Sequence, residues 1–275
     1  MTGSELRRAL REGRRVYGTC VTSASPQWPA MIAGTGLDFV FIDTEHIPID
    51  RDRLSWMCQA FRAQGLPPIV RIPKPDPYVA CMVLDGGACG VVAPYMESVE
   101  EVHQLRGAVK YRPLKGKRLE GVLDGTGTLD AALSAYIANH NRNNLCIVNI
   151  ESTPAIDALD DLLAVPDVDA LLIGPHDLSI SLGIPEEYAH PRFTRAVESI
   201  VSTGRNAGVG VGFHHSFGIE QSMAWARMGA NLIVHSSDYF IVRDTLTADI
   251  RRFREALGDA GQACAEPEGP DTVPI

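Results

Sequence analysis

The chain has 275 residues, of which 45% are hydrophobic and 21% charged, and its formal net charge is −9 at pH 7. This length is enough for one large α/β domain or two smaller ones, and the acidic balance argues against nucleic acid as the main partner. No run approaches the roughly 18 apolar residues of a membrane span, and the six cysteines form no CxxC pair, so we expect a soluble cytoplasmic protein with buried, reduced thiols.

Apolar runs and helical patterns alternate along the first half of the chain. A short basic helix, with Ser4 as a candidate N-cap, is expected first, and a long loop without a clean period is expected late in this half. In order, the expected elements are helix Ser4–Arg14, strand Arg15–Val21, helix Trp28–Gly34, strand Phe39–Ile42, helix Asp50–Ala63, strand Pro68–Ile72, helix Tyr78–Asp85, strand Gly90–Ala93, helix Ser98–Val109, loop Tyr111–Gly127 and helix Leu129–Asn139.

The second half continues the alternation and ends in a polar tail rich in Pro and Gly. In order, we expect strand Ile147–Ile150, a helix starting at Ser152–Pro154, strand Asp169–Ile173, helix Arg192–Asn206, strand Val209–Phe213 with His214 and His215 beyond it, helix Ile219–Met228, strand Asn231–His235 and helix Tyr239–Leu257. The composition of the tail from Gly258 to Ile275 is typical of a disordered segment.

Eight strands alternating with helices indicate a parallel sheet, and eight repeats within this length favour a closed (β/α)₈ TIM barrel. The alternative is an open doubly wound sheet, which normally carries a glycine-rich phosphate turn after its first strand. Tyr17-Gly18-Thr19-Cys20 is not such a turn. We therefore predict a single-domain barrel over residues 1–257, followed by a tail over 258–275.

One acidic residue follows each of two consecutive strands in the middle of the chain. Glu151 comes directly after one strand, and Asp177 follows the Gly174–Pro175 turn that ends the next. A strand–helix–strand crossover makes parallel neighbours whose carboxyl ends meet at one rim. Two hard carboxylates at such a rim suit Mg²⁺ or Mn²⁺ better than Zn²⁺. The alternative is that each carboxylate is a surface loop residue or a helix cap.

The remaining strand exits add an arginine, a histidine and further acids. Asp43, Glu45 and His46 follow the second strand, and Arg71 lies near the end of the third. An arginine can hold a keto or carboxylate oxygen by charge-assisted hydrogen bonds, and a histidine can carry protons near neutral pH. Asp43 or Asp85 could orient that imidazole. The alternatives are a loop histidine, and an arginine that serves a structural ion pair.

Five segments of the chain resemble the HpcH/HpaI aldolase family. They are FVFIDTEHIPID, IVRIP, VLDGGACGVVAPYMES, VNIES and LLIGPHDLSISLG, in the family's order, and the resemblance runs from about Thr19 to Leu257. It implies a (β/α)₈ barrel, a hexamer built from two trimers, and metal-dependent pyruvate aldolase chemistry through a metal-bound pyruvate enolate. The metal would be Mg²⁺ or Mn²⁺, with Co²⁺ as another option.

The resemblance also assigns roles residue by residue. It implies Glu151 and Asp177 as metal ligands, Arg71 as the pyruvate-binding arginine, and His46 as the base acting through a metal-bound water. Asp43 and Asp85 match the family's supporting aspartates, and Gly174–Pro175 matches the turn that receives the pyruvate carboxylate. Two substrate-side positions depart from the family pattern: Asn149 stands where many members have Gln, and His176 where many have a small residue.

A further departure lies in Tyr111–Glu120, which replaces a PPxGxRG-like segment. These departures leave open the aldehyde and the direction of the reaction. The main hypothesis is a lyase that converts a 4-hydroxy-2-oxo acid to pyruvate and an aldehyde. The alternatives are a decarboxylase or condensing enzyme acting on oxaloacetate-like substrates, a lyase of CoA thioesters, and a barrel that binds a carboxylate without turnover.

Overall fold

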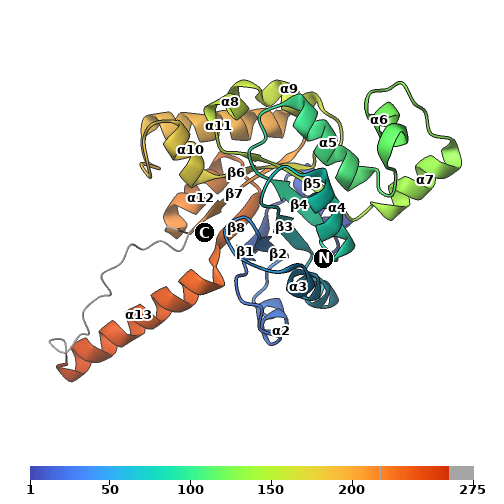
Figure 1. Ribbon diagram of the computed structural model, residues 1–275. Helices are drawn as coiled ribbons and strands as arrows, with labels where there is room; N and C mark the ends of the chain where they lie inside the picture. The colour runs from blue at the N-terminus through green and yellow to red at the C-terminus, as the bar shows by residue number, and fades with distance from the viewer. Residues whose placement is uncertain (217, 260–275) are drawn as a thin grey trace.

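The computed structural model describes residues 1–216 and 218–259 of the chain. Eight parallel strands pair in chain order, and the first also pairs with the last, so the sheet closes into a barrel (Figure 1). This confirms the predicted (β/α)₈ architecture. The strands are β1 Val16–Cys20, β2 Phe39–Asp43, β3 Pro68–Arg71, β4 Gly90–Ala93, β5 Leu145–Ile150, β6 Ala170–Ile173, β7 Gly210–His215 and β8 Leu232–Ser237.

Helices follow the strands and surround most of the barrel (Figure 1). Several start at residues whose side chains accept a hydrogen bond from a backbone N–H of the first turn, as N-caps do; Asp50, Asp76, Ser98 and Ser152 are examples. The helices are α1 Gly3–Arg11, α2 Trp28–Ala33, α3 Arg51–Ala63, α4 Pro77–Asp85, α5 Val99–Lys110, α6 Gly116–Leu123, α7 Ala131–His140, α8 Thr153–Asp157, α9 Leu159–Ala164, α10 Pro175–Ser181, α11 Pro191–Asn206, α12 Ile219–Met228 and α13 Asp238–Leu257.

The core has two apolar layers, one inside the barrel and one between the strands and the helices. Leu6 and Leu10 of α1 belong to the inner layer and are fully buried. Each such burial stabilises the fold by roughly 1.5–3 kcal/mol. Gly210 at the start of β7 leaves room for this helix, since a Cβ there would lie 3.0 Å from Leu10. The α1 helix therefore closes the end of the barrel where the strands begin.

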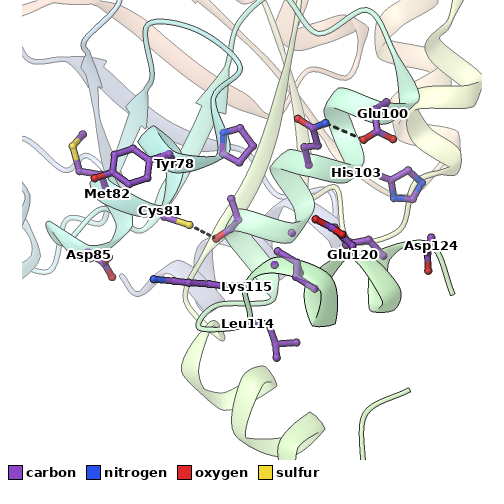
Figure 2. A pocket seen from close by; sticks show the side chains of 17 residues that line it. Tyr78, Cys81, Met82, Asp85, Glu100, His103, Leu114, Lys115, Glu120 and Asp124 are labelled. Carbon is purple, nitrogen blue, oxygen red and sulfur yellow. Dashed lines mark hydrogen bonds between the residues drawn. The ribbon is translucent and has the colours of Figure 1, made fainter. Parts of the chain in front are cut away.

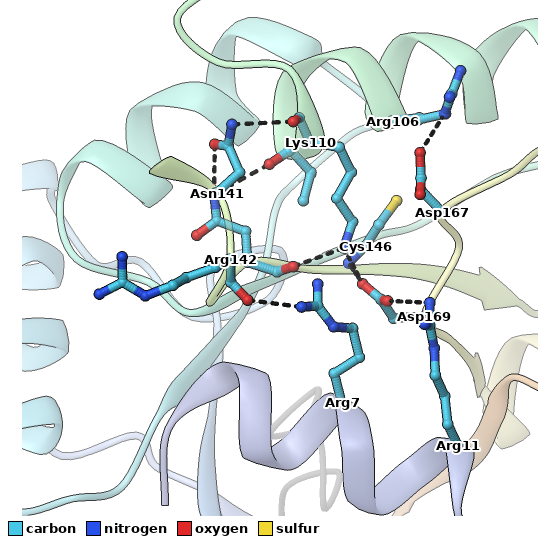
Figure 3. Close-up of polar contacts among 11 residues, drawn as sticks. Arg7, Arg11, Arg106, Lys110, Asn141, Arg142, Cys146, Asp167 and Asp169 are labelled. Atoms are coloured by element: carbon cyan, nitrogen blue, oxygen red, sulfur yellow. Dashed lines mark hydrogen bonds and ion pairs between the residues drawn. The ribbon is translucent and has the colours of Figure 1, made fainter. Parts of the chain in front are cut away.

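A polar network ties α1 and α5 to the strand starts at this closed end (Figure 3). Asp169 precedes β6 and is fully buried. Its carboxylate accepts a hydrogen bond from the backbone N–H of Cys146 at 2.9 Å, pairs with Lys110 of α5, and lies 3.4 Å from Nη2 of Arg11. Arg7 of α1 adds a hydrogen bond to the Arg142 carbonyl at 2.9 Å. This end of the barrel serves stability.

The structure corrects four local expectations. The N-cap of α1 is Thr2, which forms a capping box with Glu5, and not Ser4. The expected loop Tyr111–Gly127 contains a helix, α6, and the expected single helix after Ser152 is two short ones. His214 and His215 lie within β7 and not beyond it. Except for α6, which was not predicted, the predicted elements exist, and their bounds depend on hydrogen bonds that a periodicity does not reveal.

Three further expectations concern the C-terminal tail, membrane spans and the cysteines. The predicted disordered tail lies, from residue 260 onward, outside the described residues. Among the described residues, no helix is long and apolar enough to span a membrane. Of the free cysteines in this part of the chain, Cys20, Cys58, Cys89 and Cys146 are buried, as expected, and Cys81 is only partly buried.

Candidate active site

The crossover between β5 and β6 brings Glu151 and Asp177 to the same rim of the barrel. Ile150 pairs with Ile173 in the parallel ladder, so Glu151 and Gly174 leave the sheet side by side. Gly174 is the N-cap of α10, and Asp177 lies in the first turn of that helix. The charge of Asp177 is among the causes that raise the pKa of Glu151, as expected for two carboxylates at one rim. The structure thus brings the predicted pair together.

Glu151 is held from three sides and is only 5% exposed. Its Oε1 accepts the backbone N–H of Tyr95 at 2.7 Å, and its Oε2 accepts a hydrogen bond from the Asn149 side chain. On the third side Gly174 makes room, because a Cβ there would lie 2.9 Å from Oε2 and 3.1 Å from the Glu151 Cβ. Any side chain at position 174 would therefore occupy space that the Glu151 carboxylate needs.

The electrostatics of this carboxylate suit a cation. Burial, and then the charges of Asp177 and Glu45, raise the pKa of Glu151 to about 7 despite the Tyr95 N–H, which lowers it. Buried carboxylates that repel one another are stabilised by a divalent ion between them. The buried Oδ1 of Asn149 lacks a hydrogen-bond partner, which leaves an oxygen acceptor beside Glu151. The all-oxygen donor set fits Mg²⁺ or Mn²⁺.

In the part of the chain that the structure describes, no group of three or more His, Cys, Asp or Glu side chains is arranged to hold a metal ion. Glu151 and Asp177 would therefore supply two ligands, with water and substrate completing the shell, as is common for Mg²⁺. Among the described residues, the paired histidines of β7, His214 and His215, belong to no such group either.

Asp43 and Arg71 form a buried pair at the exits of β2 and β3. The guanidinium donates from Nε to Oδ1 at 2.9 Å and from Nη2 to Oδ2 at 2.5 Å. Burial disfavours the charged form of each group, but the bidentate bonds outweigh it, so the pKa of Asp43 is lowered and that of Arg71 is raised. Both groups stay charged, and Arg71 also feels the charges of Glu45 and Glu151. A guanidinium fixed by Asp43 thus lies beside Glu45 and within electrostatic range of Glu151.

The imidazole of His46 lies at the mouth of the barrel beside Glu45. Its Nε2 is 3.7 Å from Oε2 of Glu45, and that same oxygen is 3.2 Å from Nε of Arg71. Glu45 therefore connects the predicted base to the predicted substrate arginine. Asp43 accepts the Glu45 backbone N–H at 3.0 Å, which orients the loop that carries both residues. The carboxylate beside the imidazole is thus that of Glu45. Asp43 orients the loop of His46 only through its hydrogen bond with the Glu45 backbone N–H.

Two predicted substrate-side residues lie on α10. Pro175 is buried at the start of the helix, next to the Gly174 cap. His176 is exposed, and its Nδ1 lies 3.6 Å from a carboxylate oxygen of Glu186. Asn149 is fully buried beside Glu151. The structure therefore places Asn149 and Gly174 against Glu151, Pro175 next to Gly174 at the start of α10, and His176 at the surface.

Asp85 does not join this group, so the predicted contact with His46 is not met within one chain. It ends α4, five positions before β4 begins, and a helix after a strand runs back toward the opposite end of the barrel. Its side chain is 71% exposed and pairs with Arg112. Asp85 instead borders a cavity of about 1050 Å³ on the outer side of α4 and α5, which α6 covers (Figure 2). None of the rim residues lines that cavity.

The structure adds two residues to those predicted. His214 of β7 lies in tilted ring contact with Phe41, 5.3 Å between centroids, and burial followed by the Arg71 charge lowers its pKa to about 4. It is therefore a neutral histidine inside the barrel. Tyr95 follows β4 and contacts Glu151 through its backbone. Tyr95 lies two residues after the end of β4. Because active sites of such barrels form at the carboxyl ends of the strands, its position in the sequence could have identified it.

Comparisons with known proteins match the chain over most of its length. The family model described as HpcH/HpaI aldolase/citrate lyase matches residues 17–243. A hydroxypyruvate/pyruvate aldolase of Roseovarius nubinhibens is 31% identical, covering 90% of this chain and 95% of that protein. A 2-keto-3-deoxy-L-rhamnonate aldolase of Salmonella gallinarum is 29% identical, covering 92% and 94%.

The same relationship is visible in three dimensions. The crystal structure of an HpcH/HpaI aldolase from Desulfitobacterium hafniense matches with a TM-score of 0.78 at 27% identity, covering 91% of this chain and 96% of that one. The aldolase names of the relatives confirm the expected enzyme class, a lyase. The chain therefore belongs to the HpcH/HpaI aldolase/citrate lyase family.

Proposed function

We propose that this protein is a divalent-metal-dependent aldolase that cleaves or forms 4-hydroxy-2-oxo acids, giving pyruvate and an aldehyde. The observation that carries the proposal is the buried carboxylate of Glu151, which shares one rim with Asp177 and feels the charge of the fixed Arg71 guanidinium. Such an arrangement holds a cation and an anionic keto acid next to each other. The aldolase names of the relatives support the same reaction class.

Glu151 and Asp177 would hold the ion, with Mg²⁺ or Mn²⁺ the best fit to their oxygens and Co²⁺ the next. When bound, the ion supplies Lewis-acid polarisation of the keto oxygen. Gly174 and Asn149 determine the position of the Glu151 carboxylate and thus of its ligand oxygen. Pro175 is buried at the start of α10 beside the Gly174 cap, where the carboxylate of the keto acid would bind.

Arg71 binds and orients the keto acid. Its bonds to Asp43 use Nε and Nη2, which leaves donors on Nη1 for a substrate oxygen. As the methyl group of pyruvate loses a proton, negative charge moves to the keto oxygen, and a guanidinium already fixed in place stabilises that charge without reorganising. The ion pair with Asp43 is therefore part of the catalytic arrangement and not a separate structural contact.

His46 is the proton carrier, at its Nε2 atom. This nitrogen lies 3.7 Å from the Glu45 carboxylate, which stabilises the imidazolium formed when the ring accepts a proton. The half-exposed imidazole can then release the proton to solvent at the mouth of the barrel. In the reverse direction the same nitrogen returns a proton to the methyl carbon.

The proposal is tested by measuring pyruvate release from 4-hydroxy-2-oxo acids in a coupled assay with NADH. Release should require added Mg²⁺ or Mn²⁺, stop with chelator, and vanish in Asp177→Asn. As a matched control, Asp157→Asn on α8 changes a carboxylate outside the site and should retain full activity. Activity that survives both metal removal and Asp177→Asn would refute the proposal.

The family also contains citrate lyases, so decarboxylation, condensation and thioester cleavage remain alternatives that use the same residues. Oxaloacetate, hydroxy-oxo acids and acyl-CoA esters, assayed side by side, distinguish them by the highest kcat/KM. A barrel that binds pyruvate without turnover would show no exchange of its methyl protons with solvent.

We also propose that the protein is a homo-oligomer, as trimer or hexamer, assembled through α13. This helix extends away from the barrel (Figure 1). Its exposed apolar side chains recur at intervals of three and four, the pattern of one continuous helix face: Val242, Leu246, Ile250, Phe253 and Leu257. Soluble proteins rarely leave such a stripe uncovered, and a second copy would cover it.

An assembly also gives the only route by which Asp85 could act at a rim, namely the rim of an adjacent copy. Light scattering should show an oligomer for the natural chain and a smaller species for Leu246→Glu with Phe253→Glu. Asp249→Lys, a charge change on the same helix, is the control. A monomeric natural chain would contradict the proposal. Location in the cytoplasm remains a prediction from composition.

A further inference from the structure

His214 is an aromatic and polar side chain inside the barrel to which the proposed reaction gives no role. It lies on β7 opposite Val234 in the parallel ladder, and Val234 belongs to the apolar layer inside the barrel. Successive side chains of a strand point to opposite faces. The neighbouring His215 therefore lies on the helix side, where its ring centroid is 4.9 Å from that of Trp225. The two histidines thus serve different parts of the fold.

The ring of His214 contacts Phe41, which in turn contacts the substrate arginine. The centroids of the two rings lie 5.3 Å apart, at an interplanar angle of 48°. Phe41 stands two positions before Asp43 on β2, so their side chains point to the same face. The Cζ atom of Arg71 lies 5.9 Å from the centroid of the Phe41 ring, within the range of a cation–π contact. A chain of contacts thus joins His214 through Phe41 to the guanidinium.

A second contact holds the ring of His214 from the side of β8. Its Nε2 atom lies 3.3 Å from the carbonyl oxygen of Ser236, a residue whose φ angle of 52° falls in the left-handed region. Because a carbonyl oxygen can only accept a hydrogen bond, Nε2 carries a proton and donates it. The hydroxyl of Thr19 lies 3.5 Å from the same oxygen. The imidazole is therefore held from two sides, by the Phe41 ring and by the backbone of β8.

The charge state of His214 suits a position beside an arginine. Burial, and then the positive charge of Arg71, lower the pKa of His214 to about 4, although the charge of Asp43 acts against them. The ring is therefore neutral and adds no second positive charge that would compete with Arg71 for the Asp43 carboxylate. The position thus takes a side chain that is aromatic, uncharged and able to donate one hydrogen bond, and histidine meets all three requirements.

We propose that His214 is a positioning residue for the pyruvate-binding arginine. Its ring keeps Phe41 against the Arg71 guanidinium, and the guanidinium then presents its Nη1 donors to the keto acid in a fixed direction. The inference rests on the proposed function and adds to it a residue that acts through Phe41. A misaligned guanidinium binds the keto acid less tightly and stabilises the enolate less, because both depend on its orientation. The carboxylates of Glu151 and Asp177, at the exits of β5 and β6, lie outside this chain of contacts.

The test measures the binding of Mn²⁺, and of pyruvate at saturating Mn²⁺, by calorimetry, together with methyl proton exchange, in two variants. His214→Ala removes the ring, whereas His214→Phe keeps a ring at this position. We expect His214→Ala to weaken pyruvate binding and slow exchange about tenfold, the scale of one aromatic pair, with Mn²⁺ affinity within about twofold of natural. His214→Phe should restore pyruvate binding and exchange to within about threefold. The control is His215→Ala, on the other face of β7, which should lower the melting temperature and leave pyruvate binding unchanged.

Three results would overturn the inference. The first is natural pyruvate affinity in His214→Ala, and the second is an equal loss in His214→Phe, because the ring would then not matter. The third is an equal loss of Mn²⁺ affinity in His214→Ala, because the whole rim would then have moved. If His214→Ala does not fold, His214→Leu, which keeps a bulky side chain without an aromatic ring, takes its place with the same expectations. A natural enzyme that binds Mn²⁺ but neither binds pyruvate nor exchanges its protons would instead contradict the proposed function.

Discussion

Gly174→Ala is the most specific structural test of the carboxylate pair. A methyl group at this position would lie 2.9 Å from Oε2 of Glu151 and 3.1 Å from its Cβ. Favourable contacts between such atoms are about 3.5–4.0 Å, so the carboxylate must move by roughly half an ångström or more. The backbone itself accepts alanine, since φ is −92° and ψ is 94°. The substitution therefore displaces a proposed ligand without forcing the chain.

The expected result is a loss of metal affinity with little loss of stability. Changes that misplace a ligand typically weaken metal binding about 10–100-fold, and calorimetric titration with Mn²⁺ measures this directly. The control is Gly34→Ala, where the new methyl group would meet its nearest neighbour, the Met31 carbonyl, at an ordinary 3.4 Å. Natural Mn²⁺ affinity in a folded Gly174→Ala protein would refute the reasoning. So would a melting temperature lower by more than about 10 °C, because the glycine would then serve packing.

Three further predictions follow from the site and from the closed end of the barrel. Arg71→Lys should slow pyruvate proton exchange at least roughly a hundredfold, because a lysine cannot reproduce the bidentate pair with Asp43. The control is Arg53→Lys, at an exposed position of α3. An exchange rate of Arg71→Lys within fivefold of the natural rate would contradict this role. Since the pKa of Glu151 is about 7, metal binding below pH 7 must displace its proton. Affinity for Mn²⁺ should then fall about tenfold per pH unit, with proton release visible by calorimetry in buffers of different ionisation enthalpy, and a flat profile from pH 5 to pH 7 would be inconsistent with it. The folding stability of the metal-free protein should change with pH in the opposite direction. Because its raised pKa makes Glu151 bind a proton in the folded state between about pH 4.5 and 7, the contribution of Glu151 to stability falls as pH rises through that window. Finally, Asp169→Asn leaves the buried Lys110 ammonium without its carboxylate partner and should lower the free energy of unfolding by about 3–5 kcal/mol in urea titrations. The control is Asp167→Asn, at a half-exposed pair with Arg106, which should lower the free energy of unfolding by no more than about 1 kcal/mol. Equal effects would show that the stability of the network in Figure 3 does not depend on burial.

The meeting of Glu151 and Asp177 could be predicted because it depends on topology alone. Parallel strands joined by a right-handed crossover have their ends at one rim whatever the helix between them looks like. The division of that helix into α8 and α9 therefore did not disturb the prediction. Strand exits likewise placed Arg71 and His46 at the same rim.

Residues whose position depends on contacts across the barrel could not be predicted in this way. The helix α6 has no buried residue, so no apolar period identifies it within Tyr111–Gly127. His214 enters the barrel because β7 extends to His215. Asp85 is a different case: the family resemblance implies a role for it, although the end of α4 lies far from the strand exits of its own chain.

The central claim is that Glu151 and Asp177 jointly hold one cation, next to which bound pyruvate loses a methyl proton. Proton NMR of pyruvate in deuterated water, recorded with and without added Mg²⁺, measures the loss of the methyl protons. This measurement does not require knowledge of the aldehyde. We predict methyl exchange that requires Mg²⁺ and is lost in both Glu151→Gln and Asp177→Asn, each of which removes one ligand charge. Exchange that continues at the natural rate without the metal, or in either variant, would contradict the account.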